Sequence, residues 1–159
     1  MSGELTPSAR RVQDFLETLG LARSVREFPQ TTRSAADAAQ AIGCRVEQIA
    51  KSLVFRGKYT KKPVLVITSG ANRVNEEKAA EFAGEPLEKA DAAFVREKTG
   101  FAIGGVPPVG HLAQLLTFID EDLLREEEIW AAAGTPNAVF PLTPAELVKI
   151  TGGRIVTIK

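Results

Sequence analysis

The stretch Leu53–Thr68, LVFRGKYTKKPVLVIT, decides the fold. Two runs rich in β-formers, Leu53–Phe55 and Val64–Thr68, flank the polar segment Gly57–Lys62, and this order predicts an antiparallel hairpin. The hairpin indicates a sheet whose first strand begins near residue 51.

Lys51 stands just ahead of the first run. In a strand that starts there, Lys51 shares a face with Leu53 and Phe55, because side chains alternate along a strand. A lysine at a strand start commonly extends its ammonium into solvent. The alternative is a lysine that lines a cavity, where its charge stabilises an anion or polarises a carbonyl. The residues alone leave both interpretations open.

Around the hairpin the chain alternates helical and strand-like patterns without a βαβ rhythm. Capping residues, helical spacing and terminal glycines predict helices over 7–19, 35–42, 75–83, 92–99 and 144–150, with one further helical turn over 46–50. Short β-rich runs predict further strands over 24–28, 116–119, 129–132, 139–142 and 154–158. We therefore expect an α+β fold in a single domain over 1–159, with residues 1–22 as an N-terminal helix packed on it.

The composition excludes several functional classes. The 20 basic and 20 acidic residues balance, so a protein that coats nucleic acid through its net charge is not expected. Cys44 and His111 are the sole cysteine and histidine, which excludes disulfide frameworks and zinc fingers, so we expect no metal and no cofactor. The chain shows no signal peptide and no apolar run of transmembrane length, which predicts a cytoplasmic protein without membrane contact.

A glycine- and proline-rich segment, Gly104–Gly110, precedes His111. Glycines allow a backbone to approach a ligand and prolines hold a loop in one shape, so free N–H groups here would form an oxyanion hole. Most such segments are simple turns, and this one lacks the lysine of a phosphate-binding P-loop. Since no second histidine or GxSxG elbow is present, and Cys44 is expected to be a buried filler, the sequence does not favour covalent catalysis.

Charge is concentrated in two segments. Residues 45–73 carry seven basic side chains against Glu47 alone, whereas residues 120–128 carry six acids against Arg125. Such runs are usually solvated surface, but a basic patch on a neutral protein also suits RNA phosphates.

Taken in order, these features resemble the YbaK/ProX family of aminoacyl-tRNA deacylases, which is related to the editing domain of bacterial prolyl-tRNA synthetases. The resemblance rests on Thr32 with the alanine-rich helix, QIAKSLVF (48–55), TGF (99–101) leading to GGVPPVG (104–110), and TPAEL (143–147). It implies a mixed, largely antiparallel curved sheet, a partial barrel surrounded by helices. Because 159 residues leave no room for a synthetase core, the resemblance is to the free-standing form.

The resemblance also implies hydrolysis of the ester that joins a wrong amino acid to the 3′-terminal adenosine of a tRNA. The family lysine corresponds to Lys51 and its GxxxP loop to Gly104–Pro108, so the candidate catalytic residues are Lys51, Gly104 and Pro108. Candidate substrate-binding residues are Thr32, Ser52, Gly105, Val106, Pro107, His111, Ala132 and Gly134. Candidate tRNA contacts are Arg56, Lys58, Lys61, Lys62 and Arg73.

Ala132 departs from the family pattern, because members specific for cysteinyl esters tend to carry a small polar residue there. A tRNA for proline bearing alanine, cysteine or a similar small amino acid is therefore the expected substrate, and a prolyl-tRNA synthetase is a possible partner. The alternative from a different class is a nucleic-acid-binding or regulatory module that kept the fold without the chemistry. The residues do not indicate an oligomeric state.

Overall fold

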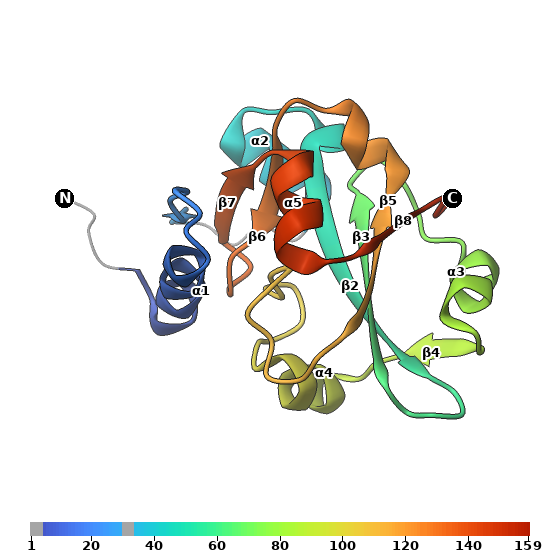
Figure 1. Ribbon diagram of the computed structural model, residues 1–159. Coiled ribbons are helices and arrows are strands. Elements are labelled where there is room, and N and C mark those ends of the chain that lie inside the picture. The colour runs from blue at the N-terminus through green and yellow to red at the C-terminus, as the bar shows by residue number, and fades with distance from the viewer. Residues whose placement is uncertain (1–4, 30–33) are drawn as a thin grey trace.

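The computed structural model describes residues 5–29 and 34–159. Its strands form one mixed sheet in the order β1-β7-β6-β2-β3-β5-β8, and β4 pairs with β2 beside this path (Figure 1). The strands are β1 (Arg26–Glu27), β2 (Ile49–Gly57), β3 (Pro63–Ser69), β4 (Leu87–Lys89), β5 (Leu116–Asp120), β6 (Ile129–Ala132), β7 (Ala138–Leu142) and β8 (Arg154–Val156). Both parallel and antiparallel pairings occur, and the sheet does not close, as expected for a partial barrel.

The helices begin where the capping residues place them. They are α1 (Pro7–Thr18), α2 (Ala35–Ile42), α3 (Glu76–Ala83), α4 (Ala92–Thr99) and α5 (Pro144–Thr151), with 3₁₀ turns at η1 (Val46–Gln48) and η2 (Glu121–Arg125). Thr143 and Glu146 form the capping box of α5, so each satisfies a backbone N–H of the other's turn. None of the described helices is long and apolar enough to cross a membrane.

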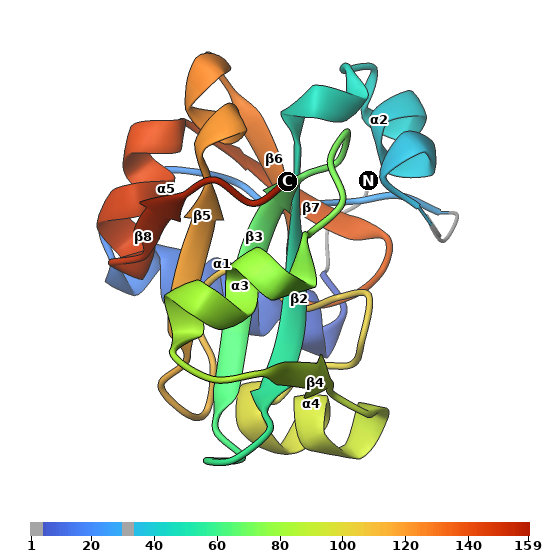
Figure 2. The same cartoon turned by 90° about the vertical axis from the view of Figure 1, so that its right-hand side faces the viewer.

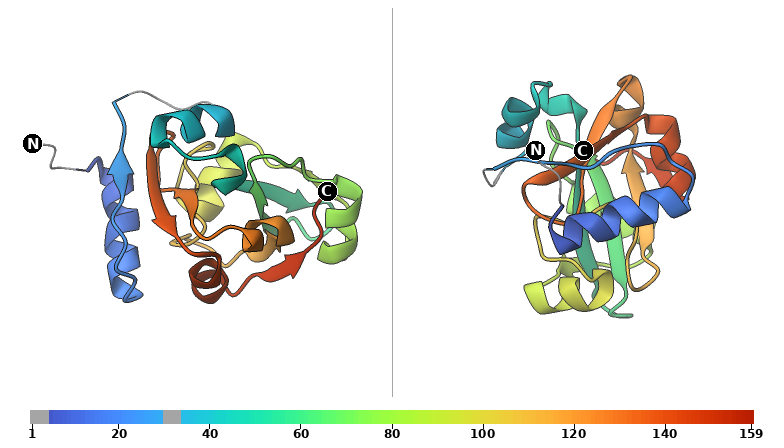
Figure 3. Two further views of the ribbon diagram at one scale, coloured as in Figure 1. Left: turned by 90° about the horizontal axis from the view of Figure 1, so that it is seen from above. Right: turned by 90° about the vertical axis from the view of Figure 1, so that its left-hand side faces the viewer.

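The two faces of β2 and β3 pack against different helices. Leu65 and Ile67 belong to the large core that includes Val12 and Leu16 of α1 and Leu147 of α5. On the opposite face, the core formed by Phe55, Val64, Val66, Phe118, Val156 and Ile158 is covered by α3. Helices α1 and α3 accordingly lie on opposite sides of the molecule (Figures 2 and 3).

Three segments differ from the sequence-based expectation. The helical turn expected over 46–50 ends at Gln48, because Ile49 and Ala50 already pair with β6 and β3. The strand expected over 24–28 shortens to Arg26–Glu27, which is held by β7. Strand β4 was not expected, since its short run LEK carries no alternation of its own and is recruited by the end of β2.

Candidate active site

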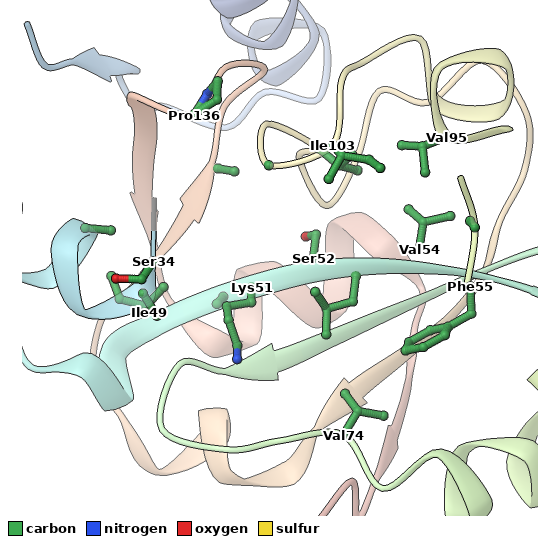
Figure 4. A pocket seen from close by; sticks show the side chains of 18 of the residues that line it. Ser34, Ile49, Lys51, Ser52, Val54, Phe55, Val74, Val95, Ile103 and Pro136 are labelled. Atoms are coloured by element: carbon green, nitrogen blue, oxygen red, sulfur yellow. The ribbon is translucent and has the colours of Figure 1, made fainter. Parts of the chain in front are cut away.

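A cavity of about 650 Å³ lies along β2. Its walls come from β2 itself, the start of α2, the segment before α3, the loop after α4, and strands β6 and β7 (Figure 4). Lys51, Ser52, Arg73, Gly104, Val106 and Ala132 are the predicted site residues that line it. The structure thus brings together residues from five distant parts of the sequence.

The cavity coincides with a gap in the sheet. On one edge, β2 pairs with β6 only through Ala50 and pairs with β4 only from Phe55 onward. Hydrogen bonds from Gly57 N to Lys62 O and from Gly70 N to Ile49 O show that odd-numbered residues of β2 bond to β3. The N–H and C=O of the even-numbered Ser52 therefore face the gap, where neither β6 nor β4 pairs with it.

Lys51 lies on the α3 side of this edge (Figure 4). Its Nζ donates to the main-chain oxygen of Asn72 at 3.2 Å, and the side chain is half-buried. Burial and the nearby Arg73 guanidinium both lower the pKa of Lys51 from its ordinary value. Two cations thus line the cavity, and neither forms an ion pair with an acid among the described residues. Such a pair suits an anion.

Ser52 points to the opposite side of β2, toward Ile103, Val54 and Val95 (Figure 4). Its Oγ is buried and has no hydrogen-bond partner. A buried hydroxyl without a partner is costly unless a ligand satisfies it. This side of the edge is therefore apolar but for the polar groups of Ser52.

The predicted glycine loop divides into a part that faces the cavity and a part behind it. Gly104 and Val106 line the cavity, and prolines have no N–H to offer. Gly105 N–H donates to Ala102 O at 3.0 Å, so the candidate oxyanion donors are the N–H groups of Gly104 and Val106. Gly104 has φ +92°, a conformation that favours glycine, with its nearest neighbour, Pro136 Cγ, 3.8 Å from an added Cβ.

Gly105, Pro107, Pro108, His111 and Gly134 do not line the cavity. Instead they support the loop from behind. Gly134 N donates to Gly105 O at 2.8 Å, and a Cβ on Gly105 would lie 2.7 Å from Thr135 Cα. The Nε2 of His111 is 2.6 Å from Pro107 O, and burial lowers the pKa of His111, so its neutral Nε2–H tautomer donates this bond. The role of these residues is to hold the loop's shape.

Helix α1 also supports this loop. Arg11 Nη1 donates to Gly100 O at 3.0 Å, and its guanidinium stacks 4.5 Å from the centre of the Phe101 ring. The backbone of Ser8 lies against Gly134, where an added Cβ would meet Ser8 O at 2.6 Å. The N-terminal helix thus contacts the loop and its support from the side away from the cavity.

The predicted tRNA contacts separate into two groups. Arg56 and Lys61 both pair with Glu88 of β4, at 2.8 and 3.1 Å. Lys58 and Lys62 lie at the exposed hairpin tip, and no ion pair holds either of them among the described residues. Only Arg73 of this set lines the cavity.

Other candidates lie elsewhere. Thr32 is outside the described residues. Cys44 does not line the cavity, and burial raises the pKa of its thiol, which agrees with a filler role. The described residues contain no group of three His, Cys, Asp or Glu side chains placed to hold a metal ion.

The sequence gave no reason to select Ile103, Val54, Val95 or Asn72. The first three looked like ordinary core positions, and Asn72 looked like a turn residue in SGAN (69–72). A signal that could have found Asn72 is its position between β3 and the cap of α3, since loops that follow strands commonly carry site residues.

Comparisons with known proteins agree with this site. Residues 29–150 match the profile of the aminoacyl-tRNA editing domain. A solved structure described as "a putative trans-editing enzyme for prolyl tRNA synthetase" superposes with a TM-score of 0.93 at 52% identity, covering 98% of this chain and 99% of the other.

Two curated relatives align over most of their length. The "Uncharacterized protein YwhH" of Bacillus subtilis is 30% identical over 82% of this chain and 83% of its own. The "Putative Cys-tRNA(Pro)/Cys-tRNA(Cys) deacylase EbsC" of Enterococcus faecalis is 27% identical over 79% of this chain and 76% of its own. The family resemblance seen in the sequence is thereby confirmed.

Proposed function

Because this chain belongs to the aminoacyl-tRNA editing domain family, we propose that it deacylates in trans a tRNA(Pro) that carries a wrong, small amino acid. Two similar proteins support the choice of tRNA, since one is described as a trans-editing enzyme for prolyl-tRNA synthetase and the other as a Cys-tRNA(Pro) deacylase. A prolyl-tRNA synthetase would then be the source of the mischarged substrate and a possible partner.

The observation that carries this proposal is the cavity at the gap in the sheet. It places two cations on one side of the β2 edge and an apolar pocket with unsatisfied polar groups on the other. The end of an aminoacyl-tRNA has the matching form, because an anionic phosphodiester is joined through ribose to a small acyl group.

In the proposed pose, Lys51 and Arg73 bind the terminal phosphate, and the acyl group enters the side that Ser52 faces. The C=O and Oγ of Ser52 would accept hydrogen bonds from the α-ammonium group of the amino acid. Both partners are polar groups that the protein itself leaves unpaired on this edge. Their satisfaction by substrate would favour an aminoacyl ester over an ester that lacks the ammonium group.

The reaction proposed is attack by water on the ester carbonyl. The N–H groups of Gly104 and Val106 would stabilise the negative charge that develops on the carbonyl oxygen. When the tetrahedral intermediate collapses, the bond to the ribose oxygen breaks, and this oxygen takes a proton to become a hydroxyl. An aminoacyl ester is already activated, so positioning and charge stabilisation suffice without a protein nucleophile. This suits a cavity that neither Cys44 nor His111 lines.

The amino acid proposed is alanine or one of similar size. Ala132, Val54, Val95 and Ile103 offer methyl groups to the side chain of the substrate, and none of them offers a hydrogen bond to a thiol or hydroxyl. A pocket of this kind discriminates weakly between side chains that differ by one small group. We therefore expect a preference for alanyl esters over cysteinyl and seryl esters that is modest in size.

The test is a set of single-turnover assays with the purified protein. tRNA(Pro) charged with alanine, cysteine, serine or proline is compared with a tRNA of different acceptor sequence carrying alanine, and with alanine ethyl ester. The expected result is release of alanine from tRNA(Pro) in preference to proline and to the free ester. Tight binding of tRNA without release of any amino acid would instead support the non-catalytic binding module.

A further inference from the structure

The loop between β3 and α3 connects Lys51 to a buried acid through a single residue, Asn72. The main-chain oxygen of Asn72 accepts the hydrogen bond from Lys51 Nζ at 3.2 Å. Its side-chain Nδ2 donates to Asp120 Oδ2 and to Asp122 Oδ2, each at 2.8 Å. One end of the residue therefore holds the lysine while the other is held by two carboxylates.

Asp120 anchors this arrangement in the sheet. It ends β5, is only 1% exposed, and accepts further bonds from Thr68 Oγ1 at 3.1 Å and from Ser69 N at 2.9 Å. Its other oxygen accepts from Asp122 N at 2.9 Å. A buried carboxylate is tolerated only when it is well hydrogen-bonded, and these bonds leave it one orientation. Its oxygen is thus a fixed point to which the loop is tied.

Lys51 needs such support because of its surroundings. The charged groups that share the cavity with it are Arg73 and Glu76 around the start of α3 and Lys89 of β4. Arg73 repels its charge and burial disfavours it. The Asn72 carbonyl is the one hydrogen-bond acceptor found for Nζ among the described residues. A lysine side chain has many rotamers, so this single bond decides where its charge lies.

We propose that Asn72, tied to Asp120, is a positioning residue that holds the Lys51 ammonium on the phosphate side of the cavity. This proposal rests on the proposed function, in which Lys51 binds the terminal phosphate. Asn72 need not touch the substrate, since its contribution passes through the lysine. Asp120 contributes one step further away, by holding the amide of Asn72.

The test compares Asn72→Ala with Glu121→Gln, a control that removes an acid next to Asp120 which bonds Thr157 and not the loop. Two quantities are measured: single-turnover deacylation against pH, and the titration of the Lys51 side chain by NMR of ¹³C-labelled lysine. For Asn72→Ala we expect a rate loss of about tenfold to a hundredfold, the range for a misplaced catalytic contact. Loss of the carbonyl bond also lowers the pKa of Lys51 further, so the alkaline fall in rate moves to lower pH.

Glu121→Gln should stay within about twofold of the wild-type rate and leave the titration of Lys51 unchanged, as expected for a surface substitution away from the contact. If Asn72→Ala fails to fold, Asp122→Asn replaces it, with the same direction and a smaller shift, since one bond to Asn72 is weakened. An unchanged Lys51 titration in the folded variant overturns the proposal, even if the rate falls. If the wild-type protein releases no amino acid, the proposed function fails, but the titration still decides whether Asn72 positions Lys51.

Discussion

The two sides of the β2 edge differ although adjacent residues make them. On the α3 side, Lys51 is charged, has a hydrogen-bond acceptor in Asn72 and lies near a second cation, Arg73. On the other side, Ser52 has a buried hydroxyl without a partner amid apolar side chains. One side is thus prepared for a charged ligand, whereas the other has polar groups that wait for one.

The difference follows from the gap in the sheet. Alternation along a strand places neighbouring side chains on opposite faces, and an ordinary sheet separates those faces completely. Here β6 ends its pairing at Ala50 and β4 begins at Phe55, so a ligand can reach both faces across the same edge. The comparison teaches that a break in pairing can combine two unlike surfaces in one site.

The largest expected effect belongs to the charged side. Replacing Lys51 with alanine should slow single-turnover deacylation by at least about a hundredfold, the scale for one lost electrostatic contact in a transition state. Circular dichroism should show an intact fold, because the ammonium has only one protein hydrogen bond. Lys149→Ala, which removes an exposed lysine of α5, is the matched control. A Lys51→Ala variant with near wild-type rates would remove this lysine from the mechanism.

A second prediction separates the loop's chemistry from its stability. Gly104→Ala forces alanine into φ +92° at a cost of about 1–2 kcal/mol, and turns the proposed N–H donors away from the carbonyl. Val109→Ala loses about 2 kcal/mol through lost core packing, since Val109 is 6% exposed. Melting temperatures should fall similarly in both, whereas deacylation should fall more than about tenfold only in Gly104→Ala. Equal rates in both variants would leave the oxyanion-hole proposal without support.

A third prediction concerns the apolar side. Ser52→Ala removes the unpartnered hydroxyl, so the free energy of unfolding should stay constant or rise by up to about 1 kcal/mol. Deacylation at low substrate concentration should fall by about fivefold to tenfold, the value of about one hydrogen bond to a charged group. Denaturant unfolding and rates on the same preparation test the pair of expectations. Lower stability with unchanged activity would show that Ser52 serves the fold alone.

The smallest expected effect is at Arg73. Arg73→Gln removes the charge that lowers the pKa of Lys51, so the alkaline fall in rate should move to higher pH. Affinity for tRNA should fall a few-fold, and the slope of log affinity against log salt should decrease by about 0.7, the value for one phosphate contact on a single strand. The same substitution at an unlined position, Arg125→Gln of η2, should change neither. A salt slope equal to that of the wild type would place Arg73 outside the RNA contact.

Much of the fold followed from local patterns. The helices start at their predicted caps because a side chain that bonds free N–H groups acts within one turn. The β2–β3 hairpin and the faces of Lys51, Leu53 and Phe55 followed from alternation. Strand β4 could not be predicted, because a three-residue strand is defined by the partner it finds.

The sequence by itself determined the α+β class, the family and the identity of Lys51 and the GxxxP loop as site residues, since caps, alternation and motif order are local properties. Tertiary structure alone decided which loop residues face the cavity, that Arg73 joins it while Arg56 and Lys61 pair with Glu88, and that Asn72 holds Lys51. These depend on contacts between segments tens of residues apart. The physical reason is that a gap between β6 and β4 exists only once both have paired with the same edge of β2.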